Sequence, residues 1–213
     1  MGPFSTDLDT RCHGMRTSAP GQSALLMADV AELLSKQGVR YAVIGAMAAA
    51  VHGIVRASLD ADAVVALQVR EALALRQFLI EEGYETALRT GDVDDPVPGL
   101  LEIKDRHGNR VDLLIGLRGM DPELLDRTRQ VRLAEAILEV VGREDFIAMK
   151  AFAGGPVDLA DARAVIDLDR GSLDLKLPSS CRTSCRPAQW AAIQRAIYRR
   201  LQPGRGAWAN TIW

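Results

Sequence analysis

The sequence predicts an α/β (α+β) fold, in which helices flank a mixed β-sheet and further helices follow at the C-terminal end. Short apolar stretches rich in β-branched residues alternate irregularly with segments whose apolar residues recur at helical spacing. Glycines stand at the ends of several of these segments, where they are typical stop signals. The chain has 213 residues, of which 48% are hydrophobic and 25% charged, so it can bury a core.

The first half of the chain predicts five elements in the order helix, strand, helix, strand, helix. The first and last helices are amphipathic, whereas the middle one consists of small residues. With their closing glycines, these elements cover residues 25–38, 39–45, 46–53, 54–67 and 69–83.

The second half predicts a strand and loop, a β-hairpin, a short helix, a strand and two helices separated by a glycine pair. The hairpin is indicated by two apolar stretches that flank the turn sequence RHGN. In chain order, these elements cover residues 84–99, 100–105 with 110–116, 121–130, 136–142, 143–154 and 156–168.

Composition predicts a loose arm over residues 1–20, a main domain over 21–177 and a basic tail over 178–213. The tail holds six arginines, no acid and all three tryptophans, so it carries +6 and leaves −8 for the rest of a chain whose net charge is −2. An amphipathic helix in the tail would pack on the domain. Alternatively, the arginines and tryptophans would bind RNA.

Cysteine usage and apolar patterning predict a cytoplasmic protein that does not enter a membrane. Three cysteines, Cys12, Cys181 and Cys185, are an odd number and argue against a disulfide framework, although with His13 they could bind zinc. The first residues contain acids and no apolar stretch of the kind found in secretory signals.

Two aspartates lie one residue apart in the predicted strand IVRASLDADAVVAL. Because side chains alternate faces along a strand, Asp60 and Asp62 share one face, and Ala61 and Ala63 lie on the other. Asp112 occupies a similar position in the apolar strand RVDLLIG. If these strands are neighbours, three carboxylates converge and require a cation between them, for which Mg²⁺ is the typical choice. The alternative is a pair of acids at a solvated strand end.

A turn upstream of these acids predicts an anion site. Gly45 ends a strand and begins a helix, so backbone N–H groups and a helix N-terminus can face a phosphate there. Arg56 lies in the linker to the Asp60–Asp62 strand and could contact phosphate. Together these features favour a nucleotide site over a generic acidic surface.

The stretch VIGAMAAAVHGIVRASLDADAVV, residues 43–65, resembles the signature of the DNA polymerase β-like nucleotidyltransferase superfamily. That signature is a strand, Gly-Gly or Gly-Ser, a small-residue helix, His-Gly, an arginine and Thr/Ser-x-Asp-x-Asp. The branch that it resembles most is the small bacterial group of AbiE toxin-like and uncharacterised proteins. The resemblance extends over about residues 25–170 and implies the superfamily's mixed-sheet fold.

The resemblance implies a Mg²⁺-dependent enzyme, with a two-metal site, that moves a nucleoside monophosphate from an NTP to a hydroxyl. Asp60, Asp62 and Asp112 would be its catalytic and metal-binding residues, and Asp112 would also activate the acceptor hydroxyl. The acceptor would be a tRNA, a protein or a small molecule, and an antitoxin is a possible partner. The residues implied in nucleotide binding are Gly45, Ala46, Arg56, Ser58, Lys150 and Asp158.

Several of these residues have alternative interpretations. Ala46 stands where the family has a second glycine or a serine, and a lost serine hydroxyl removes a hydrogen bond worth about 1 kcal/mol. The chain could therefore be a nucleotide-binding module with weak or no activity. Lys150 could be a snorkelling lysine, and Asp158 could simply complement a helix dipole. Ser58 could shape the turn before Asp60.

Overall fold

The computed structural model describes residues 15–92, 95–117 and 121–168. The chain divides into two compact units, Met1–Val51 with Val55–Gly142, and His52–Ile54 with Arg143–Trp213. The predictions for the cysteines, the zinc site and the basic tail fall outside the described residues. Within them, no helix combines the length and the apolar character needed to cross a membrane.

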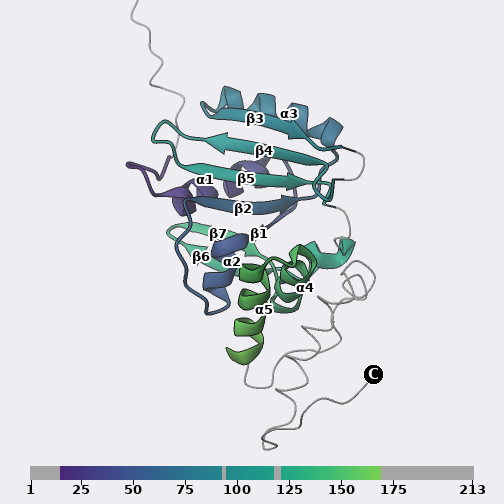
Figure 1. Ribbon diagram of the computed structural model, residues 1–213. Helices are drawn as coiled ribbons and strands as arrows, with labels where there is room; N and C mark the ends of the chain where they lie inside the picture. The colour runs from purple at the N-terminus through teal and green to yellow at the C-terminus, as the bar shows by residue number, and fades with distance from the viewer. Residues whose placement is uncertain (1–14, 93–94, 118–120, 169–213) are drawn as a thin grey trace, which may run out of the picture. The chain divides into compact units, whose positions relative to one another are not determined.

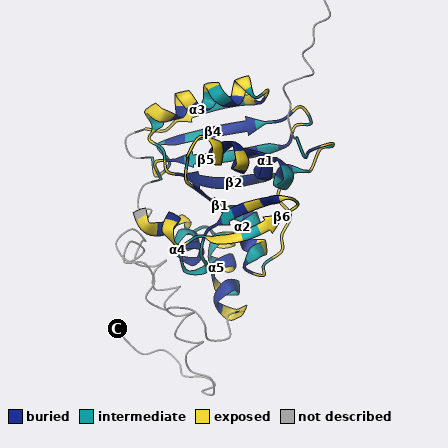
Figure 2. Ribbon diagram, turned by 180° about the vertical axis from the view of Figure 1, so that it is seen from behind, coloured by how far each residue is buried: buried dark blue, intermediate teal, exposed yellow. Residues whose placement is uncertain are grey.

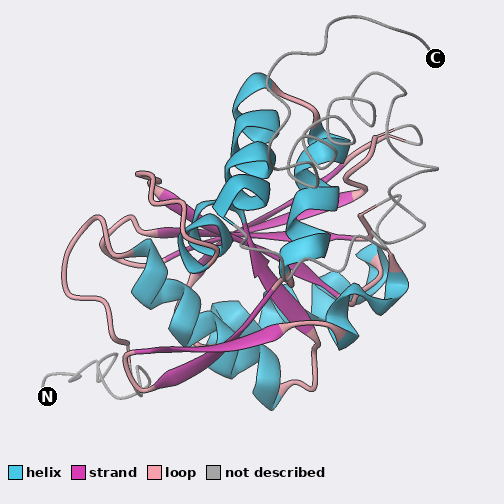
Figure 3. Ribbon diagram, turned by 90° about the horizontal axis from the view of Figure 1, so that it is seen from below, coloured by secondary structure: helices cyan, strands magenta, loops and turns pink. Residues whose placement is uncertain are grey.

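The first unit is built on one mixed sheet of seven strands in the order β3-β4-β5-β2-β1-β7-β6 (Figure 1). β2 is parallel to β5 and β1 is parallel to β7, whereas the other neighbours are antiparallel. Viewed from below, the strands fan out as a twisted sheet (Figure 3). The predicted α/β class is confirmed. The strands are β1 (Tyr41–Ile44), β2 (Asp60–Val65), β3 (Glu85–Thr90), β4 (Gly99–Lys104), β5 (Arg110–Ile115), β6 (Arg129–Leu133) and β7 (Ala136–Val140).

Helices lie on both faces of this sheet. Helix α1 lies behind the sheet in Figure 1 and in front of it in Figure 2, whereas α2 lies on the face turned to the viewer in Figure 1. Helix α3 packs along β3 and exposes its outer side (Figure 2). The bounds are α1 (Ser23–Lys36), α2 (Gly45–Val51), α3 (Val69–Glu81) and the short 3₁₀-helix η1 (Pro122–Asp126).

The core of the first unit forms from the apolar side chains on one face of the central strands. Ala61 and Ala63 of β2 are buried there with Val111 and Leu113 of β5. The α1 residue Ser23 is also buried and joins the two strands, because its Oγ donates to the Leu59 carbonyl and accepts from the Arg110 N–H.

The structure differs from the sequence prediction at two strands. β2 begins at Asp60 rather than at residue 54, and the side chains of Val55 and Leu59 before it are each 88% exposed. The predicted helix over 121–130 ends at Asp126, and Arg129–Leu133 forms β6. The sequence RQVRL is mostly polar and does not by itself predict a strand. Residues 129–133 are stabilised as a strand by their pairing with β7.

The second unit contains the two predicted helices, α4 (Arg143–Ala153) and α5 (Pro156–Leu168). Gly154, which has a φ of +68°, separates them. Phe146 of α4 is buried, and the His52 ring packs against it with 5.3 Å between ring centroids.

The turn of the β4–β5 hairpin is held by two buried polar side chains. Asp105 accepts hydrogen bonds from the backbone N–H groups of His107 and Asn109 and from the Asn109 side chain. Asn109 also accepts from the N–H of Gln22 next to α1. Burial alone would raise the pKa of Asp105, but the hydrogen bonds from Asn109 and His107 lower it below its usual range.

Replacing Asp105 by asparagine is expected to lower the free energy of unfolding by about 1–3 kcal/mol near neutral pH, because charge-assisted hydrogen bonds are lost. A carboxylate with a lowered native pKa stabilises the fold above its unfolded pKa, and this stabilisation disappears as the pH falls through the native value. The difference between wild type and variant should therefore shrink in acid, as measured by urea unfolding at several pH values. The exposed Arg106→Ala is the control, and a constant difference would contradict the assignment.

Candidate active site

The register of β2 against β5 places the predicted acids on one face of the sheet. Asp62 pairs with Asp112, and Asp60 pairs with Arg110. Because directly paired residues share a face, Asp60, Asp62 and Asp112 lie on the face opposite the core alanines. The side chains of Asp60 and Asp112 are 27% and 14% exposed.

Two further charged residues on this face were not predicted. Glu102 of β4 pairs with Asp112 from the other side, so three acids form a row across β2, β5 and β4. Arg110 lies two residues before Asp112 and forms an ion pair with Asp60. Its Nε lies 3.5 Å from Asp112 Oδ1, and its Nη1 lies 3.7 Å from Glu102 Oε2. Alternation along the predicted strand places Arg110 on the same face as Asp112, but the approach of Arg110 to Asp60 and of Glu102 to Asp112 depends on which strands are neighbours.

The carboxyl groups on this face experience different environments. A 2.7 Å hydrogen bond from Ser58 lowers the pKa of Asp60, and Arg110 lowers it further. Lys104, whose Nζ is 2.8 Å from Glu102, likewise lowers the pKa of Glu102. Burial raises the pKa of Asp112. Of these three carboxyl groups, Asp112 is therefore the one that takes up a proton most readily.

The acids supply the oxygen ligands that Mg²⁺ prefers, and they share one face of the sheet. Oδ1 of Asp112 is buried and has no hydrogen-bond partner among the residues that the structure describes, so it can accept a further positive group. However, the described part of the chain contains no three Asp, Glu, His or Cys side chains drawn together tightly enough to hold a metal. The cation that contacts Asp60 and approaches Asp112 is Arg110.

Gly45 lies directly against Asp62. A Cβ added to Gly45 would overlap the Asp62 carboxylate, and its distance to Asp62 Cγ would be 3.1 Å. Gly45 also has a φ of +63°, a conformation that glycine adopts without strain. The turn after β1 therefore requires a glycine for two independent reasons.

The other predicted nucleotide-binding residues of the first unit follow this turn within 13 residues of the sequence. Ala46 is buried in α2, which has seven residues, and Arg56 is exposed in the loop before β2. Ser58 in the same loop contacts Asp60, as its hydrogen bond shows.

Lys150 and Asp158 belong to the second unit, where they form a partly buried charge cluster. Lys150 Nζ lies 2.7 Å from Asp158 Oδ1, 3.2 Å from Asp161 Oδ2 and 5.7 Å from the centre of the Phe146 ring. The Lys150 residue is only 9% exposed, so it does not snorkel into water. Asp158 lies in the first turn of α5, where it complements the helix dipole, and it also forms an ion pair with this lysine.

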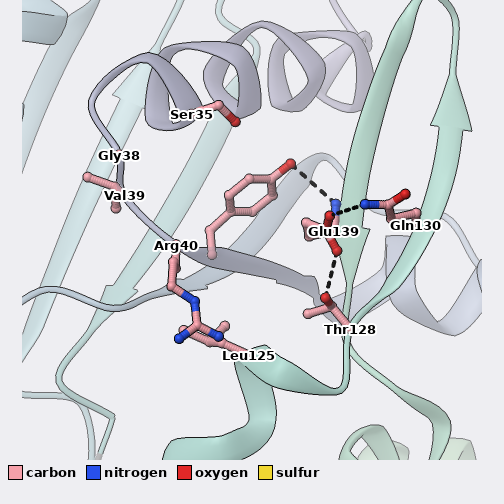
Figure 4. A pocket seen from close by; sticks show the side chains of 9 residues that line it. Ser35, Gly38, Val39, Arg40, Leu125, Thr128, Gln130 and Glu139 are labelled. Carbon is pink, nitrogen blue, oxygen red and sulfur yellow. Dashed lines mark hydrogen bonds between the residues drawn. The ribbon is translucent and has the colours of Figure 1, made fainter.

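A separate polar pocket of about 560 Å³ lies at the other end of β1 from Gly45. Its polar groups bind one another: the Tyr41 hydroxyl accepts from the Glu139 N–H, and Thr128 and Gln130 donate to the Glu139 carboxylate (Figure 4). Because these polar groups are hydrogen-bonded to one another, they do not require a ligand as a partner. The pocket also contains none of the predicted site residues.

The sequence matches no protein-family model and no curated protein. Among solved structures, a "putative nucleotidyltransferase" from Thermotoga maritima aligns with a TM-score of 0.50 at 15% identity, over 73% of this chain and 99% of that chain. An antigenic nucleotidyltransferase-like protein from Paracoccidioides brasiliensis aligns with a TM-score of 0.49 at 15% identity, over 84% and 95%. At 15% identity the first likeness concerns the fold alone: the chain has a nucleotidyltransferase-like fold.

The contact between Gly45 and Asp62 can be tested with a matched pair of glycine substitutions. Gly38 has nearly the same φ, +65°, but a Cβ there would meet nothing within 4 Å. Gly38→Ala is expected to lower the free energy of unfolding by about 1 kcal/mol through backbone strain alone. Gly45→Ala should lower it by about 2 kcal/mol or more in urea unfolding, because the carboxylate must also move. Equal losses would show that the contact is unimportant.

The charge cluster of the second unit predicts that Lys150→Met destabilises the protein by about 2 kcal/mol, because two partly buried carboxylates lose their cation. Adding Asp158→Asn to that variant should recover part of the loss. The exposed Arg163→Met is the matched control and should change the free energy of unfolding by less than about 0.5 kcal/mol. Thermal or urea unfolding measures all three, and a neutral Lys150→Met would refute the cluster's role.

Proposed function

We propose that the protein is a Mg²⁺-dependent nucleotidyltransferase that moves a nucleoside monophosphate from an NTP to a hydroxyl acceptor. The observation that carries the proposal is the pairing of Asp62 with Asp112 on one sheet face, next to a turn whose glycine touches Asp62. The nucleotidyltransferase-like fold is consistent with it. The sequence signature over residues 43–65 favours the AbiE toxin-like branch, so we also propose a toxin paired with an antitoxin.

Asp60, Asp62 and Asp112 would hold the divalent ions. When bound, these ions would neutralise phosphate charge and stabilise the attacking and leaving oxygens. Asp112 would take the proton of the acceptor hydroxyl, whose oxygen then forms a bond to the α-phosphorus of the NTP. The bond from that phosphorus to the oxygen bridging to the β-phosphate breaks, and pyrophosphate leaves with the bonding electrons. The side chains act mainly by positioning the groups and compensating their charge.

The remaining proposed contacts are to the nucleotide. The Gly45 backbone would lie against the triphosphate, with Ala46 beside it, and the exposed Arg56 would supply a positive charge. Ser58 would act through Asp60, to which it is hydrogen-bonded. For Lys150 and Asp158 to bind nucleotide, the lysine must exchange its ion pairs within the second unit for the phosphate. The acceptor would be a hydroxyl of a tRNA, a protein or a small molecule.

A second candidate is a module that binds NTP without turnover. Two observations favour it: Ala46 lacks the hydroxyl found in the family's Gly-Ser turn, and Arg110 already neutralises Asp60. The RNA-binding alternative depends on residues 178–213, and deletion of that tail should abolish RNA affinity at low salt if it is correct.

Incubation of the protein with labelled NTPs, Mg²⁺ and a cell extract as a source of acceptors should label an acceptor and release pyrophosphate. Asp62→Asn should reduce this transfer by about 10²-fold or more, because the substitution removes a charge from the reacting centre. The matched control is Asp126→Asn, which changes an exposed aspartate of the same unit and should retain activity. Undiminished transfer by Asp62→Asn would refute the assignment, and NTP binding without transfer by wild type would favour the second candidate.

A further inference from the structure

We propose that Arg110 competes with the divalent cation for Asp60, so that the ion enters the site only when the guanidinium leaves this carboxylate. The inference rests on the proposed function, because it assigns Asp60 to the metal site. It adds a residue that controls how strongly the metal binds.

The first argument is the position of the guanidinium among the acids. Arg110 forms an ion pair with Asp60 of β2, and it lies within 3.7 Å of Glu102 on β4 and within 3.5 Å of Asp112 on its own strand. One arginine therefore approaches carboxylates on three adjacent strands. A hard cation that uses these oxygens would have to occupy the same space.

The second argument is how the surrounding charges are divided. Glu102 has cations of its own, since Lys104 Nζ lies 2.8 Å away and Arg89 lies 3.9 Å away. Asp60 has only Ser58 and Arg110 as partners among the contacts described for it. Loss of Arg110 would thus leave Asp60 without a positive partner, but Glu102 would keep two.

The third argument is an incomplete contact at Asp112. Arg110 Nε and Asp112 Oδ1 are both buried, and neither has a hydrogen-bond partner among the residues that the structure describes. The guanidinium points its Nη2 at Asp60 and stays 3.5 Å from Asp112, which is too far for a good hydrogen bond. Arg110 therefore compensates the charge of Asp112 without satisfying its oxygen, whereas a small ion with several oxygen ligands can satisfy both acids.

The test measures Mn²⁺ binding, by electron paramagnetic resonance or calorimetry, in the full-length protein without nucleotide. Arg110→Gln should raise the Mn²⁺ affinity by about tenfold or more, because the ion no longer displaces a paired cation. Arg110→Lys keeps the charge but loses the planar guanidinium, whose paired N–H donors match a carboxylate. It should therefore raise the Mn²⁺ affinity by a smaller factor than Arg110→Gln does. Lys104→Gln removes one positive charge beside Glu102 and controls for long-range electrostatics, so it should change the affinity by less than about threefold.

Thermal unfolding gives an independent readout. Without metal, Arg110→Gln should melt below wild type, because Asp60 and Asp112 lose their counter-charge, and saturating Mn²⁺ should raise its melting temperature by more than it raises that of wild type. If Arg110→Gln does not fold without metal, Arg110→Lys provides the same comparison.

The possible failures are distinguishable. Equal or lower Mn²⁺ affinity in both Arg110 variants, or an equal gain in Lys104→Gln, would overturn the competition. Absence of Mn²⁺ binding in every variant would overturn the metal site and the competition together. If the affinities change as expected but no variant transfers a nucleotide, the competition stands and the proposed enzymatic activity fails.

Discussion

The parallel pairing of β2 with β5 is the constraint on which the rest of the candidate site depends. Side chains alternate along both strands, so a register slip of one residue would turn Asp60 and Asp62 toward the core and expose the alanines. Ser23 helps to fix this register, because a single hydroxyl bonds the backbone just before β2 and at the start of β5. The apolar burial on one face therefore determines where the acids lie on the other.

In both units a basic side chain lies among partly buried carboxyl groups. In the second unit Lys150 pairs with two aspartates of the next helix, and both ion pairs are short. In the first unit Arg110 faces carboxylates on three strands but makes one close pair and two loose contacts. The ion pairs of Lys150 are therefore closer, at 2.7 and 3.2 Å, than the contacts of Arg110 with Glu102 and Asp112, at 3.7 and 3.5 Å. The looser contacts belong to the face that carries the candidate site, where the proposed cation would have to displace the guanidinium.

Much of the fold follows from local patterns in the sequence. The amphipathic helices, the β4–β5 hairpin and the strand that ends at Gly45 are all found where apolar spacing and glycines predict them. β6 could not be predicted, because its sequence is mostly polar and becomes a strand through pairing with β7. Alternation placed Asp60, Asp62 and Asp112 on a common face but could not show that an arginine stands among them, since that depends on which strands are neighbours. The contact between Gly45 and Asp62 is a tertiary property for the same reason.

The two outer strands of the sheet, β3 and β6, differ from the inner ones in that their charged residues are exposed. β3 carries the exposed Glu85 and Arg89, and β6 carries the exposed Arg129 and Arg132. Charged side chains on an edge strand oppose the docking of a further strand, because they would be desolvated or brought against like charges. The polar residues that make β6 difficult to predict as a strand therefore also oppose aggregation by strand pairing at this edge of the sheet.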